Sequence, residues 1–356
     1  MEPAPRFPTV AALPGVPFLR EDRLVTHSVV ISGTGLWTPE QSITNEELVA
    51  SFNEYVARHN ERHADAIEAG EMEPLTGSNS AFIEKASGIK QRYVLDKEGI
   101  LDPDRLAPNI PERSDDELSV QAEIAVLAAR RALDNAGLKP DDLDAVLVAC
   151  SNMQRAYPAM AVEVQQALGM EHGWGYDMNV ACSSATFGIQ TGVDAIRNGS
   201  ARRVLMVNPE ICSGHLAWED RDCHFIFGDV STAVILERAE DATSDNQWEV
   251  LGTRLQTRFS NNIRNNFGFL NRADPSGVGS RDKLFRQEGR KVFKEVCPMV
   301  AEQITGHLAD LSVPVEDVRR MWLHQANLNM NEFIARRVLG RDPSRDEAPV
   351  ILDDYA

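Results

Sequence analysis

The stretch that decides the fold of this 356-residue chain is Trp174-Gly-Tyr-Asp-Met-Asn-Val-Ala-Cys182-Ser-Ser-Ala-Thr-Phe-Gly-Ile-Gln-Thr-Gly-Val-Asp-Ala-Ile-Arg-Asn198. Apolar and aromatic residues run up to Val180, small residues surround Cys182, and apolar residues then recur at helical spacing. The stretch therefore predicts a strand that turns directly into a helix, with a cysteine at the junction.

A cysteine at the start of a helix is a candidate nucleophile. The first N–H groups of a helix have no partner within the helix, and the helix dipole favours negative charge there, so a thiol at Cys182 is biased toward thiolate. A free cysteine is also a common small core residue. The stretch alone leaves both interpretations open.

Strands and helices alternate on both sides of this stretch. In the first half we expect strands at 28–35, 144–150, 203–208 and 231–236, and helices at 44–73, 119–136 and 160–168. A second series comprises a strand near 248–256, a helix at 288–310, a strand at 319–323, a helix at 327–339 and a strand beginning near Val350. This alternation predicts a largely parallel sheet with helices on both faces, in two related α/β halves.

The expected division of the chain is a flexible N-terminal arm at 1–27, a first half at 28–245 and a second half at 246–356. Five prolines in the arm disfavour regular structure there. Gly33 and Gly35 lack the third glycine of a dinucleotide fingerprint, so a tight turn is expected at this pair.

Composition excludes several classes of protein. The net charge of −18 argues against a nucleic-acid or anionic-membrane binder. The stretch 254–294 holds ten Lys/Arg and three Asp/Glu, a local +7 that fits either a phosphorylated or acidic ligand or a solvated face. Five widely spaced cysteines without a Cys-x-x-Cys pair predict no disulfides or zinc site and a reducing, cytoplasmic setting. The sequence contains no long apolar run, so neither a membrane-spanning segment nor secretion is predicted.

Two histidine positions call for an interpretation. His324 follows a short apolar strand and precedes a helix, as Cys182 does, so it is either a structural residue or an acid/base partner of the thiol. His59 and His63 lie four residues apart on a polar helical face, for which a solvated helix is the expected role and no metal is predicted.

Several motifs together resemble the β-ketoacyl-[acyl carrier protein] synthase III family of the thiolase superfamily. They are Gly88-Ile-Lys-Gln-Arg-Tyr, Val180-Ala-Cys-Ser-Ser-Ala, Phe227-Gly-Asp229 and His324-Gln-Ala-Asn-Leu328. The resemblance implies a five-layered αβαβα sandwich of two halves and a homodimer. It implies that Cys182 takes an acyl group from acyl-CoA and that malonyl-acyl carrier protein then loses carbon dioxide and attacks the thioester, as in fatty acid biosynthesis. His324 would stabilise the enolate oxygen.

The resemblance also assigns substrate-binding positions, and no cofactor beyond acyl-CoA as a substrate. The substrate-binding residues are Tyr157, which reaches the partner's acyl pocket, and Phe82, Asn271 and Phe227. Phe82 and Ala86 stand where well-known members have the tryptophan and arginine that stack on the CoA adenine, and Asn329 replaces an arginine linked to carrier binding.

Two further departures from the family pattern produce expectations. The third catalytic residue of the family, an Asn, would follow Ala356, so the second half is expected to be incomplete at its C-terminus. The charged segment at about 53–80 looks like an insertion at the entrance, and it motivates the hypothesis of an acyl primer longer than acetyl. The alternatives are a related thiolase-fold enzyme with a non-carrier acceptor, or an inactive truncated or non-catalytic subunit.

Overall fold

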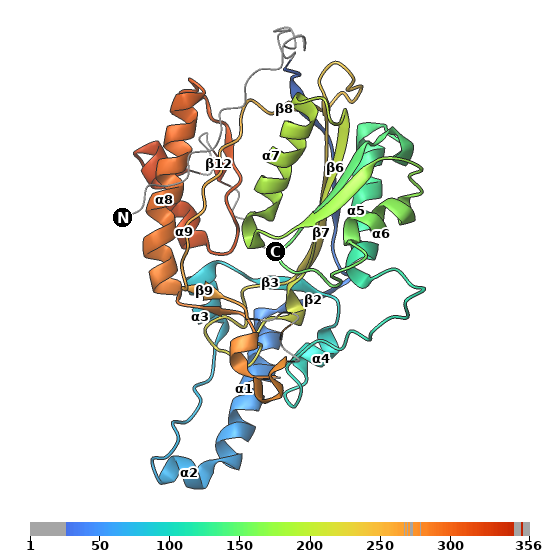
Figure 1. Ribbon diagram of the computed structural model, residues 1–356. Coiled ribbons are helices and arrows are strands. Elements are labelled where there is room, and N and C mark those ends of the chain that lie inside the picture. Colours follow the sequence, from blue (N-terminus) through green and yellow to red (C-terminus); the bar gives the residue numbers. More distant parts are fainter. Residues whose placement is uncertain are drawn as a thin grey trace, which may run out of the picture.

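A computed structural model describes residues 26–266, 268, 270, 273–277, 279–344 and 350–351. A sheet covered by helices forms its centre (Figure 1). This sheet has six strands in the order β5-β4-β6-β7-β1-β8. The strands of this sheet are β1 (Val29–Trp37), β4 (Ala145–Ala149), β5 (Trp174–Met178), β6 (Arg203–Ile211), β7 (Asp229–Arg238) and β8 (Trp248–Glu249). All five residues of β4, Ala-Val-Leu-Val-Ala, are buried, as expected for a strand covered on both faces.

The sheet is mixed rather than largely parallel. Strand β4 pairs in parallel with β5 and β6, whereas β7 pairs antiparallel with both β6 and β1. The connection from β6 to β7 holds a short 3-10 helix, η3 (Cys212–Gly214), but no crossover helix, so the chain returns in the opposite direction. The alternation of elements in the sequence did not reveal this reversal.

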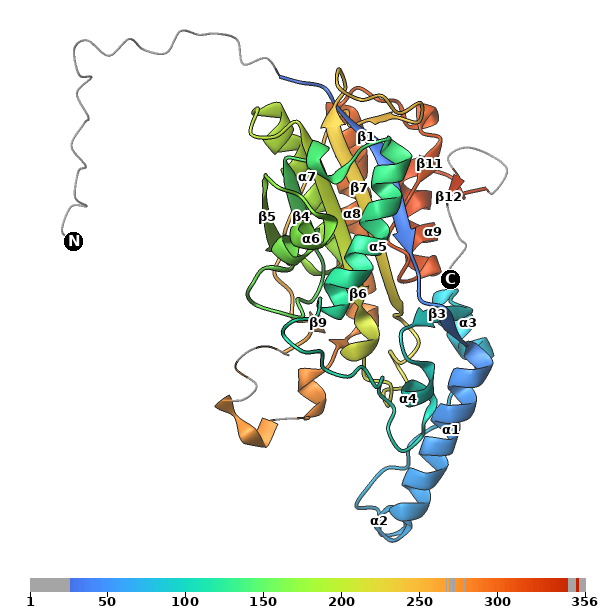
Figure 2. The same cartoon turned by 90° about the vertical axis from the view of Figure 1, so that its right-hand side faces the viewer.

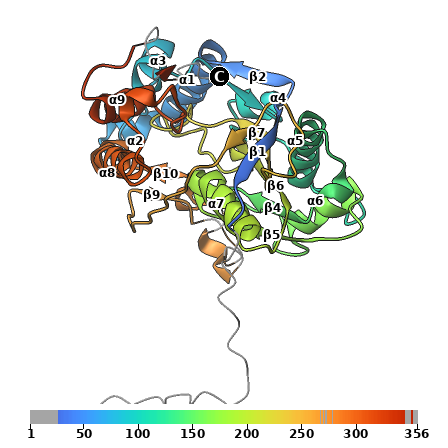
Figure 3. The ribbon, with the colours of Figure 1, turned by 90° about the horizontal axis from the view of Figure 1, so that it is seen from above.

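Helices cover both faces of the sheet. On one face lie α5 (Val120–Ala136) and α6 (Met160–Leu168), and on the other lies α7 (Ser184–Arg197). Seen from above, α7 lies between the sheet and the helices α8 (Gly289–Asp310) and α9 (Leu328–Leu339) (Figure 3). This arrangement makes α7 the innermost helix, and the cysteine junction precedes it.

Gly33 and Gly35 do not form the predicted tight turn, because both lie within β1. A Cβ atom on Gly33 would come 2.3 Å from the carbonyl oxygen of Ala132, and one on Gly35 would come 2.0 Å from that of Ala128. These two residues are glycines because the backbone of α5 packs directly against β1 at this point.

A helical arm projects from the body of the protein (Figure 2). It contains α1 (Asn45–Arg62) and α2 (Ala64–Glu68), and the chain returns to the body at α3 (Ser80–Ser87). Thr44 and Glu47 form a capping box at the start of α1. The returning chain is fastened by Asn53, whose side chain bonds both the N–H and the carbonyl of Ser78. At the base of the arm lie β2 (Gln41–Thr44), β3 (Gln91–Val94) and α4 (Lys97–Leu101).

The second series of elements is packed around α8 and α9. These two helices and the parallel pair β11 (Arg320–Met321) and β12 (Val350–Ile351) match the predicted order. The predicted strand near 248–256 is limited to β8. A separate small pair is formed by β9 (Ile263–Arg264) and β10 (Arg286–Gln287). Within the described ranges, no helix is long and apolar enough to cross a membrane. The division into two halves near residue 245 stays a prediction.

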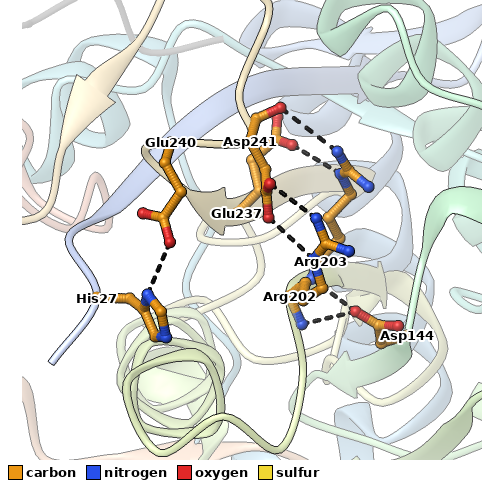
Figure 4. A network of polar contacts seen from close by, with 7 residues as sticks. All are labelled: His27, Asp144, Arg202, Arg203, Glu237, Glu240 and Asp241. Carbon is orange, nitrogen blue, oxygen red and sulfur yellow. Dashed lines mark hydrogen bonds and ion pairs between the residues drawn. The ribbon is translucent and has the colours of Figure 1, made fainter. Parts of the chain in front are cut away.

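A network of charged side chains lies where β6 begins and β7 ends (Figure 4). Arg203 pairs with Glu237 at 2.9 Å, and Arg202 pairs with Asp241 at 2.7 Å. The carboxylate of Asp144 accepts the backbone N–H groups of both arginines. The network therefore joins β6, β7 and the residue preceding β4 at one end of the sheet.

Candidate active site

Cys182 lies on a sharp turn between β5 and α7, as the sequence predicts. The turn contains the short 3-10 helix η2 (Ala181–Ser183), and Ala181 has a positive φ of 49°. A left-handed backbone is unfavourable for a residue with a side chain, and strained residues of this kind cluster at functional sites. The chain is thus bent at the residue before Cys182, whose side chain is exposed.

The electrostatic environment of Cys182 differs from the sequence prediction. Burial by the surrounding protein is the main cause that raises the pKa of the Cys182 thiol above its ordinary value, and the Glu210 carboxylate is the second cause. The backbone N–H of Cys182 itself lowers this pKa, but by less. Loss of hydration and a nearby negative charge therefore outweigh the helix start. The predicted bias toward thiolate is wrong for the protein without substrate.

A polar cluster lies on the ends of β4 and β6 near this thiol. Glu210 accepts the backbone N–H of Ser151 at 2.7 Å and also the hydroxyl of Ser151. Burial is the main cause that raises the pKa of Glu210. Cys212 donates its thiol to Glu210, and burial together with Glu210 raises the pKa of Cys212 well above its ordinary value. Cys212 is thus a weak nucleophile, in contrast to the exposed Cys182.

His324 lies between β11 and α9, and so, like Cys182, it follows a strand and precedes a helix. Burial of the imidazole lowers the pKa of His324, so the ring is neutral near pH 7. Asn327 caps α9 through the N–H of Met330 and donates to the carbonyl of Ala86 at 2.8 Å. Within the described part of the chain, neither Cys182 nor His324 has a side-chain hydrogen bond to another residue, so both are available to substrate.

The structure brings together two motifs that are far apart in the sequence. Asn329 donates to the carbonyl of Lys85 at 3.2 Å, and Asn327 bonds the next carbonyl along α3. A Cβ on Gly88 would lie 2.8 Å from Leu328. The Gly88 and His324 motifs therefore form one unit, with the end of α3 supporting the start of α9.

Phe82 has a cationic neighbour that the sequence analysis missed. The guanidinium of Arg221 lies 4.4 Å from the centre of the Phe82 ring. Arg221 also donates its Nε–H to the carbonyl of Gly77 at 2.8 Å, which orients the guanidinium. The resemblance to the family placed Ala86 where well-known members have the arginine, whereas the arginine that contacts Phe82 in the fold is Arg221, from the loop before β7.

The other predicted substrate-binding residues lie in different surroundings. Phe227 packs in an aromatic cluster, 4.7 Å from the Phe285 ring and 6.0 Å from the His215 ring. Tyr157 is 87% exposed. Asn271 lies outside the described residues.

Two other features of the sequence are the His59 and His63 pair and the basic stretch at 254–294. The rings of His59 and His63 are 4.6 Å apart, and the described residues contain no cluster of three or more metal-ligating side chains. The basic stretch is partly neutralised, since Arg254 pairs with Asp310. A cavity of about 560 Å³ between this stretch and α8 is lined by both basic and acidic side chains. These features do not change the assignment of the site.

The chain is similar to known proteins in both sequence and structure. The family model of 3-oxoacyl-[acyl-carrier-protein (ACP)] synthase III matches residues 176–258. A beta-ketodecanoyl-[acyl-carrier-protein] synthase from Pseudomonas aeruginosa is 66% identical over 306 residues, which cover 86% of this chain and 87% of the relative. A beta-ketoacyl-[acyl-carrier-protein] synthase III from Sinorhizobium medicae is 33% identical over 268 residues, 75% of each chain.

Solved structures agree with the predicted fold class. The 3-oxoacyl-[acyl-carrier-protein] synthase III of Aquifex aeolicus has a TM-score of 0.66 at 23% identity, and the match covers 87% of this chain and 81% of that one. The corresponding enzyme of Pseudomonas aeruginosa also has a TM-score of 0.66, at 21% identity, and covers 90% and 84%. The thiolase-like, layered αβαβα architecture is therefore confirmed.

Proposed function

The chain belongs to the β-ketoacyl-[acyl-carrier-protein] synthase III family and is a condensing acyltransferase of fatty acid biosynthesis, and we propose that it condenses an eight-carbon acyl primer with malonyl-acyl carrier protein. The observation that carries the chain length is the 66% identity to a beta-ketodecanoyl synthase. A ten-carbon product requires an eight-carbon primer, because decarboxylation leaves two of the three malonyl carbons. Octanoyl-CoA is the corresponding donor.

In the first half-reaction, the Cys182 thiolate attacks the carbonyl carbon of octanoyl-CoA. The bond from that carbon to the CoA sulfur breaks, and CoA leaves as a thiolate that takes up a proton. The position of Cys182 next to a strained residue, with an exposed side chain, supports this role, because an acyl-CoA could reach the thiol. Its raised pKa means that acyl transfer needs loss of the thiol proton, so this step is expected to quicken as pH rises.

In the second half-reaction, malonyl-acyl carrier protein loses carbon dioxide and the electron pair of the broken bond forms an enolate. A neutral imidazole has one N–H donor, and we assign that donor of His324 to the enolate oxygen. The enolate carbon then attacks the octanoyl thioester, and the Cys182 thiolate leaves. The products are 3-oxodecanoyl carrier protein, carbon dioxide and the free enzyme.

Phe82 and Arg221 are proposed to bind the adenine of acyl-CoA. An aromatic ring and a guanidinium both stack favourably on a nucleobase. The two groups now contact each other, so adenine would stack on the outer face of one of them or separate the pair. The bond from Arg221 to Gly77 ties this position to the base of the helical arm, which would then border the entrance.

The enzyme is proposed to act as a cytoplasmic homodimer. Strand β5 is an edge of the sheet, and its Trp174 and Tyr176 stack at 8° while remaining 36% and 40% exposed. Pairing with β5 of a second copy would cover this edge. Tyr157, 87% exposed, would then reach the acyl pocket of the partner subunit. The five free thiols favour a reducing compartment.

The first test is mass spectrometry of the protein after incubation with acyl-CoAs of two to twelve carbons, with Cys182→Ala as the control. We expect an octanoyl adduct to form fastest, and only when Cys182 is present. Addition of malonyl carrier protein should convert the adduct to 3-oxodecanoyl carrier protein. Faster reaction with acetyl-CoA would overturn the proposed chain length.

His324→Ala separates the two half-reactions. We expect the octanoyl adduct to form at nearly the normal rate, whereas condensation falls by about a hundredfold or more, because an oxyanion donor is lost. Equal loss of both steps would contradict the assignment. A non-carrier acceptor is not favoured by the comparisons, and malonyl-CoA in place of malonyl carrier protein tests that alternative directly.

A further inference from the structure

A chain of hydrogen bonds connects Glu210, at the end of β6, to the strained turn before Cys182. Its first link is the Glu210 carboxylate, which accepts both the N–H and the hydroxyl of Ser151. This double contact fixes the position of Ser151 just beyond β4. The route to the nucleophile therefore begins on a strand that does not carry it.

The next links run through Asn179. The amide nitrogen of Asn179 donates to the carbonyl of Ser151 at 2.8 Å. The amide oxygen of Asn179 accepts the backbone N–H of Ala181 at 3.0 Å. One side chain thus joins the anchored Ser151 to the residue that immediately precedes Cys182.

Ser184 holds the other side of the same turn. Its hydroxyl accepts the N–H of Val180 at 2.9 Å and lies 2.8 Å from the carbonyl of Ala181. It also lies 3.2 Å from the carbonyl of Cys150. The peptide groups on both sides of Ala181 are therefore restrained by two side chains, that of Asn179 just beyond β5 and that of Ser184 at the start of α7.

This restraint keeps Ala181 in an unfavourable backbone conformation. The left-handed conformation of Ala181, with φ 49°, costs about 1–2 kcal/mol and persists only where neighbouring groups enforce it. If the turn relaxed, the Cα–Cβ bond of Cys182 would rotate with the backbone and move the thiol. A displacement of about 1 Å at a reacting atom can lower a rate by about a hundredfold.

We propose that Glu210 is a positioning residue for Cys182, acting through Ser151, Asn179 and the backbone of Ala181. The proposal rests on the nucleophilic role of Cys182 given above and adds the group that sets its orientation. This role requires no contact between Glu210 and the substrate. The Glu210 carboxylate accepts the two hydrogen bonds from Ser151 on two separate oxygens, whereas an amide at the same place has one oxygen and an NH2 group that can only donate.

The structure contains a matched control for a merely structural role. Asp229 is a buried carboxylate that accepts the N–H of Ser213 at 2.9 Å and the Ser213 hydroxyl at 2.8 Å. Its remaining bond, at 2.9 Å, is from the N–H of Leu95. Asp229, like Glu210, therefore accepts the N–H and the hydroxyl of one serine, but its contacts lead to η3 and to the residue after β3 and not to Ala181.

The experiment compares Glu210→Gln, Asn179→Asp and Asp229→Asn by two rates at Cys182: single-turnover octanoyl transfer and alkylation by iodoacetamide across pH. An aspartate at 179 can still accept from Ala181 but cannot donate to the Ser151 carbonyl. For Asn179→Asp and Glu210→Gln we expect octanoyl transfer to fall by about tenfold to a hundredfold. For Asp229→Asn we expect a lower melting temperature with octanoyl transfer within about twofold of wild type.

The alkylation profile separates positioning from charge. Glu210 raises the pKa of Cys182, so removal of its charge in Glu210→Gln should shift the profile toward lower pH. If Glu210 acted through charge alone, octanoyl transfer would rise with the thiolate fraction, and that result would overturn the proposal. Unchanged octanoyl transfer in both Glu210→Gln and Asn179→Asp would overturn it equally. Absence of octanoyl transfer in the wild type would instead refute the proposed function.

Discussion

The polar side chains at the two ends of the six-stranded sheet differ in how they are stabilised. Where β6 begins and β7 ends, Arg203 and Glu237 form an ion pair and Arg202 and Asp241 form another (Figure 4). Where β6 ends and β7 begins, burial raises the pKa of Cys212 and of Glu210 and lowers the pKa of His224. In all three groups, burial disfavours the charged form.

The difference reflects what each end does. Paired charges fix the alignment of strands, since each charge compensates its neighbour. Buried titratable groups with shifted pKa values are typical of sites that carry out proton transfer or nucleophilic chemistry. The end with the ion pairs should therefore govern stability, and the end with the shifted pKa values should govern reactivity and the response to pH.

The largest expected effect on stability is that of Arg203→Ala. The side chain of Glu237 is completely buried, and one of its carboxylate oxygens has no partner within the described residues even in the wild type. Removal of Arg203 leaves a buried charge without compensation, so we expect the free energy of unfolding to fall by about 3–5 kcal/mol. Urea unfolding measures this loss, and octanoyl transfer per folded molecule should be unchanged.

Arg202→Ala is the control for Arg203→Ala. Its side chain is 56% exposed, and the pair with Asp241 is solvated. Solvated pairs contribute little, so this variant should unfold nearly as the wild type does. Similar losses for the two arginines would show that burial is not the deciding factor at this end of the sheet.

The sequence predicts the reactive end better in its elements than in its contacts. The positions of Cys182 and His324, each after a strand and before a helix, follow from local apolar patterns and were confirmed. The reversal of β7 and the contact of Arg221 with Phe82 depend on segments that meet only after folding, and local periodicity holds no record of them.

Close backbone packing and bond chains were hidden for the same reason. Gly33 and Gly35 were assigned to a turn because glycine is common in turns, whereas the nearness of α5 to β1 decides their identity. The link from Glu210 to Ala181 joins β6, β4 and β5, and no spacing along the chain reveals it.

The next largest effect is the pH dependence that His224 produces at the reactive end. Burial, then the nearby Arg92, lowers its pKa to about 3, while the unfolded chain has the ordinary value near 6.5. Between these values the unfolded state binds a proton that the native state does not, so stability falls as pH falls below 6.5. His224→Gln should remove about 2 kcal/mol of the stability difference between pH 7 and pH 5.

Unfolding of the wild type and His224→Gln at pH 7, 6 and 5 measures this effect. Glutamine can retain the contact with Ser78, whose hydroxyl lies 3.4 Å from the imidazole, so the variant should fold. Parallel pH dependences in the two proteins would place the titrating group elsewhere.

The smallest effect concerns the strained residue itself, and it opposes stability to reactivity at one position. Ala181→Gly removes the Cβ that makes a φ of 49° unfavourable, but glycine also has more freedom in the unfolded chain. We expect stability to rise by about 0.5 kcal/mol, because the relief of strain slightly exceeds the entropic cost. Octanoyl transfer should fall several-fold, because the turn that aims Cys182 loosens.

Ala57→Gly, on the exposed face of α1, is the matched substitution in an ordinary helical residue. There glycine should lower stability by about 1 kcal/mol and leave octanoyl transfer unchanged. Opposite signs of the two stability changes, measured by urea unfolding, would show that Ala181 stores strain, whereas a loss at both positions would mean that the turn before Cys182 is not strained. A stabilised but fully active Ala181→Gly would confine that strain to folding and remove it from the positioning of the thiol.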